Sequence, residues 1–333
     1  MSTEEGVTAR TIPSREEVLS YFERLSNWGR WGEDDQLGTL NLITPQKRLE
    51  AIALVRDGAV IPLGMDLDPE NPDPIGRETV LKRETAVHHL GHRIQGTREV
   101  IEMQTHGSPT HMDAPSHMAW DGKLYNGYPA SEVTPESGAR KMGIENARGG
   151  VVSRGVLLDI PGLRGVDWLE PGEAIYPEDL DGAEERQGVR VREGDVLIAR
   201  TGYLRRVEVQ GPADRRCNGY HAGCLPWLHE RGVSVISSDA LNDIQPSGYG
   251  LTTQIIDIPV EERSKIPNEE VELLLPVHCV ALVAMGAWLI DNVVVEQLLE
   301  ACRERGRWEF LITIEPLRWV GSSGSQVNPL AIF

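Results

Sequence analysis

Residues 105–117 read THGSPTHMDAPSH and hold three of the nine histidines of the chain. His111 and Asp113 are two positions apart, so their side chains project from the same face if the segment is extended. Pro109 and Pro115 disfavour a helix at this point, which favours the extended conformation. An imidazole and a carboxylate that face one point are typical ligands of a divalent transition metal. The stretch therefore predicts a metal site, and the alternative is a surface loop with solvated histidines.

Two protein ligands are too few for a metal site, and three further residues are candidates. His117 can approach the same point from a turn. His278 and Asp291 stand at the two ends of the apolar run of residues 279–290. We interpret this run as a strand and a turn whose ends reach a common site. The alternative for either residue alone is an ordinary polar group at the end of a strand.

The composition excludes several classes of protein. The chain has 333 residues, a formal net charge of −18 and 40% hydrophobic residues. Such an acidic balance argues against a main role in binding nucleic acid or an anionic membrane surface. The longest apolar run, with 12 residues, is too short to span a bilayer, and no signal peptide is visible. Four cysteines without a CxxC pair favour free thiols in a cytoplasmic setting.

Capping signals and apolar runs predict the main elements. Ser14 and Thr44 begin two helices, and the second is expected to extend to about Asp57. Short β-branched runs predict buried strands at residues 155–160, 195–200, 233–237, 280–283 and 310–314. Further helices are expected at residues 225–231 and 293–305.

Strands and helices mixed over the whole length favour one α/β or α+β domain with an N-terminal helical extension. We expect residues 1–10 to be a flexible tail and residues 162–187 to be a surface insertion. Asp239, at the end of a predicted strand, is a weaker candidate for the site. The chain has no Walker loop, no GxGxxG after a strand and no GxSxG elbow. Dinucleotide binding and serine-hydrolase chemistry are therefore unsupported.

Residues 110–117 resemble the THxDxPxH core of the cyclase family of metal-dependent hydrolases, which includes bacterial kynurenine formamidase and isatin hydrolase. Four further stretches resemble the longer bacterial members of that family: residues 28–41, 122–127, 277–278 and 324–329. The likeness covers roughly residues 20–333. It implies a single domain over residues 11–333, with a mixed, barrel-like β-sheet core flanked by helices (the swivelling β/β/α fold).

The resemblance also implies the roles of the site residues. It makes His117 the catalytic base and provides five metal ligands, His106, His111, Asp113, His278 and Asp291. Asp291 stands where the family usually has Glu, so the carboxylate is kept but is one methylene shorter. The family's first ligand falls at Gly107, whereas His106 lies one residue earlier. A one-residue bulge would bring His106 to the metal, and otherwise it donates a hydrogen bond to a ligand.

The implied activity is hydrolysis of the C–N bond in a cyclic amide or arylformamide, with zinc or manganese as the cofactor. Water activated by the ion attacks the carbonyl while His117 takes a proton. The alternatives are lactone hydrolysis, cyclisation of a polyketide-like substrate, and non-catalytic binding of a metal or small molecule. Trp28 and Trp31 either line a pocket for a flat aromatic substrate or pack the N-terminal helix onto the core. Family members are usually dimers or tetramers, so we expect a homodimer or homotetramer.

Overall fold

The computed structural model describes residues 10, 12–77, 79–90, 92–213, 216–250, 262, 265–267 and 273–333. Apart from Arg10, the tail predicted for residues 1–10 lies outside these residues. Within the described ranges, no helix combines the length and the apolar character that crossing a membrane requires. All four cysteines are buried, and none of them forms a disulfide bond.

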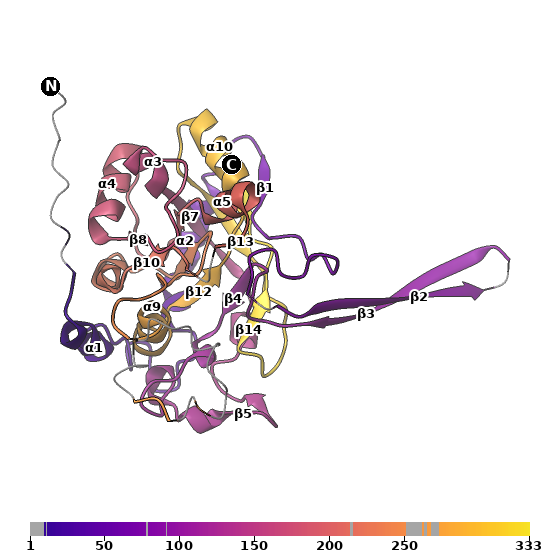
Figure 1. Ribbon diagram of the computed structural model, residues 1–333, viewed down its shortest axis with the longest axis horizontal. Helices are drawn as coiled ribbons and strands as arrows, with labels where there is room; N and C mark the ends of the chain where they lie inside the picture. The colour runs from indigo at the N-terminus through magenta and orange to yellow at the C-terminus, as the bar shows by residue number, and fades with distance from the viewer. Residues whose placement is uncertain are drawn as a thin grey trace.

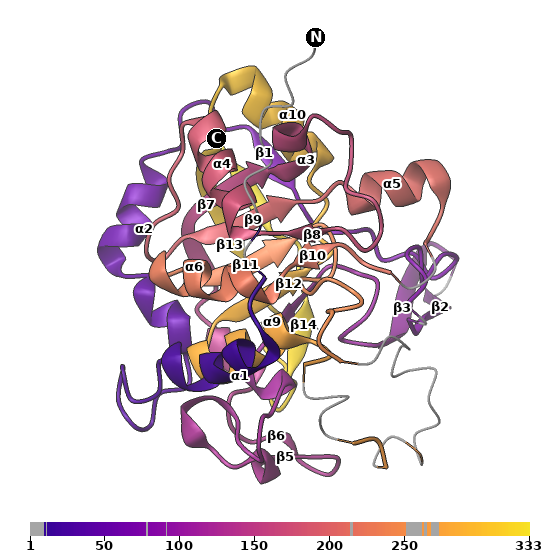
Figure 2. The same ribbon diagram turned by 60° about the vertical axis from the view of Figure 1, so that its left-hand side comes forward.

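One mixed sheet of nine strands forms the centre of the described chain (Figure 1, Figure 2). From edge to edge its strands are β1 (Val60–Pro62), β15 (Leu330–Ile332), β13 (Glu309–Ile314), β7 (Val151–Asp159), β9 (Val196–Arg200), β11 (Val235–Ser238), β12 (Trp288–Asp291), β4 (His111–Asp113) and β14 (Gly324–Gln326). The central strands β7, β9, β11 and β12 run parallel, and the pairs towards both edges are antiparallel. Helices flank this curled sheet, which confirms the expected α/β core.

The helices come from all parts of the chain. They are α1 (Arg15–Arg24), α2 (Pro45–Ile52), α3 (Ile160–Arg164), α4 (Pro177–Gln187), α5 (Tyr203–Gln210), α6 (Leu225–Glu230), α9 (Pro276–Cys279) and α10 (Glu296–Arg305). Short 3-10 helices are η1 (Gly38–Leu42), η2 (Pro115–His117), η3 (Tyr125–Gly127), η4 (Ala130–Glu132), η5 (Ile144–Ala147) and η6 (Ala222–Cys224). Two small sheets pair β8 (Ala174–Ile175) with β10 (Gly219–Tyr220) and β5 (Val133–Thr134) with β6 (Gly138–Ala139).

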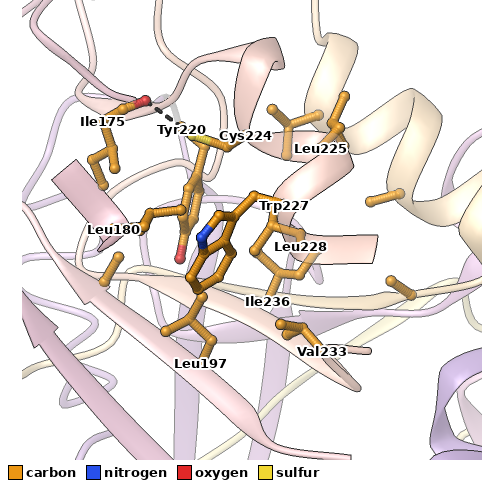
Figure 3. Close-up of a cluster of buried hydrophobic side chains, with 14 of the residues drawn as sticks. Ile175, Leu180, Leu197, Tyr220, Cys224, Leu225, Trp227, Leu228, Val233 and Ile236 are labelled. Atoms are coloured by element: carbon orange, nitrogen blue, oxygen red, sulfur yellow. Dashed lines mark hydrogen bonds between the residues drawn. The ribbon is translucent and has the colours of Figure 1, made fainter. Parts of the chain in front are cut away.

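Side chains of the central strands alternate between two cores on opposite faces of the sheet. Leu197 of β9 packs into one core, whereas Val196 and Ile198 pack into the other. Figure 3 shows the first core, where Leu180 of α4 and Leu228 of α6 lie over the sheet. Because both faces are covered, the central strands are apolar at nearly every position, which is the pattern that revealed them in the sequence.

The two predicted N-terminal helices are present, but the second is shorter than expected. Ser14 caps α1, because its hydroxyl oxygen accepts a hydrogen bond from the backbone N–H of Glu17. α2 ends at Ile52 instead of about Asp57. The backbone N–H groups of Asp57 and Gly58 donate to the carbonyl of Phe333 instead. Pairing with the C-terminal segment therefore replaces the last predicted turn.

The strand predicted at residues 280–283 is wrong. Residues Val280–Met285 form a π-helix, η8, which continues α9 and ends where Gly286 takes a φ of 63°. The second half of the same apolar run forms β12. A fully buried helix has no polar face, so its apolar run cannot be told from a buried strand by periodicity.

Residues 162–187 are not a surface insertion. They include α4, in which Leu180 and Ala183 are fully buried in the core. Pro177 is the first residue of α4, and Gly188 closes the helix with a φ of 63°. The Pro and Gly that suggested a loop are therefore the start and stop signals of a helix.

A long hairpin projects from the body of the protein (Figure 1). It consists of β2 (Leu81–Leu90) and β3 (Ile94–Met103), which pair along their full length. Apolar side chains on it, such as Val87, Ile94 and Ile101, are half or more exposed. Because the body covers neither face, its sequence lacks the apolar alternation that marks a half-buried strand, and the sequence analysis did not find it.

His221 is buried next to the rings of Tyr176 and Tyr249 and is held in its neutral form. Its Nδ1 accepts a hydrogen bond from the backbone N–H of Gly223 (3.1 Å). Its Nε2 lies 3.3 Å from the hydroxyl oxygen of Tyr249, which in turn donates to the carbonyl of Pro13. Burial lowers the pKa of His221 to about 4.

This environment predicts that His221 weakens the fold in acid. In the unfolded chain His221 titrates near its ordinary pKa of about 6.5, so between about pH 6.5 and 4 the unfolded chain binds more protons. The contribution of His221, about 1–3 kcal/mol, is complete above that range and is lost as the pH falls through it. H221N keeps an acceptor for Gly223 but does not titrate. Urea unfolding at acidic and neutral pH is expected to show a smaller pH dependence in H221N than in the wild type, and an equal dependence would contradict the assignment.

Candidate metal centre

β4 lies between β12 and β14 near one edge of the sheet, and it carries His111 and Asp113. The register with β12 places Asp291 opposite His111. On β14, Gly324 lies opposite Asp113, and a Cβ added there would come within 2.5 Å of the His106 ring. Gly324 therefore leaves the space in which His106 lies beside Asp113.

Four side chains converge at this point. His111 Nε2 lies 3.7 Å from Asp113 Oδ1 and 4.0 Å from Asp291 Oδ2. His278 Nε2 lies 3.5 Å from Asp113 Oδ2 and 3.6 Å from Asp291 Oδ2. Ligands bound tetrahedrally at about 2.1 Å from an ion stand about 3.4 Å from one another. The structure thus brings together two pairs of residues that are far apart in the sequence, at separations that fit a divalent ion.

Hydrogen bonds orient both imidazoles of this group. His111 Nδ1 lies 2.8 Å from the carbonyl oxygen of Pro109, and His278 Nδ1 lies 2.6 Å from Asp243 Oδ2. Both partners are acceptors, so each Nδ1 carries a proton, and each Nε2 faces the centre as the atom that would bind an ion. Asp243 also accepts from the backbone N–H groups of Val277 and His278, which fixes the start of α9.

The donor set fits a bound cation. Asp113 Oδ2 is buried and has no hydrogen-bond partner among the described residues. A buried carboxylate oxygen without a hydrogen-bond partner destabilises the folded protein, and coordination to a metal ion would satisfy this oxygen. Two sets of three residues place their donor atoms within 4.8 Å of one another: His106, Asp113 and His117, and His111, Asp113 and Asp291.

The charges of the centre favour ionised carboxylates. Burial alone would raise the pKa of Asp113, but the imidazoles of His117 and His106 outweigh it and hold that pKa well below the usual value. Burial also opposes the ionised form of Asp291, and His278 lowers its pKa in spite of this. Both acids are therefore ready to bind a cation at neutral pH.

His106 and His117 stack beside the centre, with ring centroids 3.9 Å apart. His106 Nδ1 lies 2.8 Å from Asp113 Oδ1, and its Nε2 lies 3.0 Å from Ser323 Oγ. Because both nitrogens of His106 have partners, this geometry matches the hydrogen-bonding alternative better than direct ligation. Burial lowers the pKa of His117 to about 4, so its imidazole is neutral near pH 7.

The centre opens into a cavity of about 340 Å³. Besides the six site residues, its lining is mostly apolar and contains one guanidinium: Ile75, Gly76, Arg77, Gly107, Tyr203, Cys217, Leu241, Gln245, Leu274 and Leu275. These residues come from separate segments and form no motif. No sequence pattern therefore connects them.

Two polar residues, neither of them predicted as a ligand, support the site from outside. Asn242 Nδ2 donates to Asp291 Oδ1 (2.6 Å). Asn292 takes a φ of 60°, and its Nδ2 donates to the carbonyls of Gly107 and Ser108, which fixes the loop before β4. The neighbouring pair Asp291-Asn292 was a usable signal for Asn292, since asparagine tolerates this backbone conformation.

Trp28 and Trp31 do not line the cavity. The indole N–H of Trp28 donates to the carbonyl of Val283 (2.7 Å), and the Arg30 guanidinium lies 4.8 Å above the Trp31 ring. The side chain of Asn126 hydrogen-bonds to the backbone of the same segment at residues 29–35. The Trp28 indole is thus bound to the body of the protein at η8, and neither indole is part of the described cavity lining.

Asp239 also lies outside the cavity lining. Its carboxylate accepts hydrogen bonds from the backbone N–H groups of Thr201 and Gly202, and so fixes the start of α5. Burial raises its pKa to about 6. The polar residue at this strand end is structural.

Comparison with known proteins agrees with this geometry. The family model described as "Putative cyclase" matches residues 43–242, more than half of the chain. The chain belongs to the cyclase family. Among curated proteins, none matches the sequence.

Solved structures share the cyclase-family fold. The crystal structure of a novel cyclase is 28% identical, with a TM-score of 0.76, and the match covers 94% of this chain and 99% of the other. Isatin hydrolase A from Labrenzia aggregata, solved with benzyl benzoate, is 18% identical, with a TM-score of 0.53 and coverage of 86% and 98%. An isatin hydrolase bound to the product analogue thioisatinate is 15% identical, with a TM-score of 0.53 and the same coverage. At these identities the two isatin hydrolases show a common fold only.

Proposed function

We propose that the chain is a metal-dependent hydrolase that cleaves the C–N bond of a cyclic amide or an arylformamide. The observation that carries this proposal is the convergence of His111, Asp113, His278 and Asp291 beside His117 in one cavity. Imidazole and carboxylate donors on two buried strands and one helix form a preorganised site for zinc or manganese.

In this proposal the protein side chains divide into ligands and groups that position or exchange protons. The ion is bound by the Nε2 atoms of His111 and His278 and by the carboxylates of Asp113 and Asp291. His106 hydrogen-bonds to Asp113 and holds it in place. When bound, a divalent ion polarises a carbonyl group and lowers the pKa of water.

His117 is the proposed general base. Its neutral ring nitrogen takes a proton from the attacking water and passes it to the leaving nitrogen. Water adds to the carbonyl carbon and the C–N bond breaks, which gives a carboxylate and an amine. The apolar walls exclude other water from the reacting carbonyl.

Elemental analysis and turnover assays test this proposal together. We expect purified protein to contain a stoichiometric divalent metal and to hydrolyse N-formylkynurenine or isatin, and we expect a chelator to abolish turnover and added metal to restore it. A lactone panel assayed in parallel separates C–N from C–O specificity. A metal-loaded protein that hydrolyses none of these compounds would contradict the proposal and favour a binding role. The cytoplasmic setting and the dimer or tetramer stay predictions.

A further inference from the structure

Arg77 stands apart from the other residues that line the cavity. It lies shortly before β2, where its backbone N–H donates to Asp73 Oδ1 (2.6 Å), and its side chain is only partly exposed. Apart from the site imidazoles, it is the only basic side chain in the described lining. The cavity therefore has a metal-binding group, apolar walls and one permanent positive charge.

Among the described residues, no carboxylate is paired directly with the guanidinium of Arg77. Its Nη2 donates to Cys217 Sγ (3.2 Å), and no carboxylate of the described residues forms an ion pair with it. Burial would lower the pKa of Arg77, but Cys217 and Asp291 outweigh this and raise it. A partly buried guanidinium is costly when no carboxylate among the described residues pairs with it directly, and the carboxylate of a ligand would stabilise it.

The other residues of the lining indicate the size and the apolar character of a ligand that binds at Arg77. Ile75, Leu241, Leu274 and Leu275 provide apolar surface, and the Tyr203 ring adds an aromatic face. A volume of about 340 Å³ lies at the small end of the range for ligand pockets. The cavity suits a compact, largely apolar molecule with one charged end.

We infer that the substrate carries a carboxylate, separate from the bond that is hydrolysed, and that Arg77 binds this carboxylate while the scissile carbonyl lies at the metal centre. Guanidinium and carboxylate form paired N–H···O bonds, so Arg77 selects acidic amides against neutral ones of the same shape. This inference rests on the proposed hydrolase function and names its substrate class. Arg77 is thus a specificity residue.

A matched pair of arylformamides tests the inference with the metal-loaded protein. 2-Formamidobenzoate carries the carboxylate, and formanilide lacks it. We expect R77Q to lower kcat/KM for 2-formamidobenzoate by about 10- to 100-fold, mainly through KM, and to leave formanilide nearly unchanged. R77K should recover part of the loss. The control R186Q removes an exposed arginine of α4 and is expected to change neither substrate. An equal loss on both substrates, or no loss, would overturn the inference.

A binding measurement separates failure of this inference from failure of the proposed function. Calorimetry with benzoate and benzamide needs no turnover, and a bound metal contributes equally in the wild type and in R77Q. We expect benzoate to bind the wild type about 10-fold or more tightly than R77Q, and benzamide to show no difference. If the protein hydrolyses neither these two arylformamides nor N-formylkynurenine nor isatin, the proposed function fails, while this binding difference still decides the role of Arg77. Benzoate that binds both proteins equally, or neither, contradicts it.

Discussion

Replacing Asp113 by Ala is expected to remove stoichiometric metal from the protein and to abolish turnover. The carboxylate of Asp113 is 1% exposed, and its two oxygens lie against His106, His111 and His278. Loss of a residue that only orients a ligand costs about 10- to 100-fold in metal affinity, so loss of a ligand itself is expected to cost more. Elemental analysis after dialysis measures the effect directly.

The controls for Asp113 separate ligation from folding. D113N keeps the shape of the side chain and removes its charge, and it is expected to lose metal as well. D66A removes an exposed carboxylate outside the cavity and is expected to retain metal. A circular dichroism spectrum shows whether each variant is folded. Full metal content in folded D113A would refute the assignment of Asp113 as a ligand.

Replacing His117 by Ala is expected to leave the metal in place and to lower kcat by about 10²–10⁴-fold, the usual contribution of a general base. His117 stacks on His106, and burial keeps its imidazole neutral. Turnover of the best formamide substrate and metal content are measured on the same preparation.

The control for His117 is H88A, which removes an exposed histidine from the projecting hairpin and is expected to change neither quantity. Two results would contradict the role of His117. Unchanged turnover in H117A would remove it from the mechanism. Loss of metal in H117A would make it a ligand, with His106 and Asp113 as its partners.

The part of the site that lies on β4 was predictable from residue spacing alone. His111 and Asp113 share a face because alternate residues of a strand do so, and two prolines exclude a helix. His278 and Asp291 were predicted from their places at the ends of one apolar run. Their positions agree with this prediction, although the run is a helix followed by a strand.

The rest of the site depends on contacts that no local pattern encodes. Asp243 orients His278 from 35 positions away, and Ser323 reaches His106 across 217 positions. Arg77 and Tyr203 meet only because the loop before β2 and the start of α5 line the same cavity. The projecting hairpin was not predicted either. Both of its faces are exposed, so its sequence does not alternate between apolar and polar residues.

The projecting hairpin leads directly into the site, and its base is anchored to the central sheet. The side chain of Gln326 donates to the carbonyls of Gln104 and Thr105, just after β3 and before His106. These hydrogen bonds fix the end of the hairpin to β14 at the residues just before His106. A molecule that contacts the tip of the hairpin therefore does so at residues outside the described cavity lining.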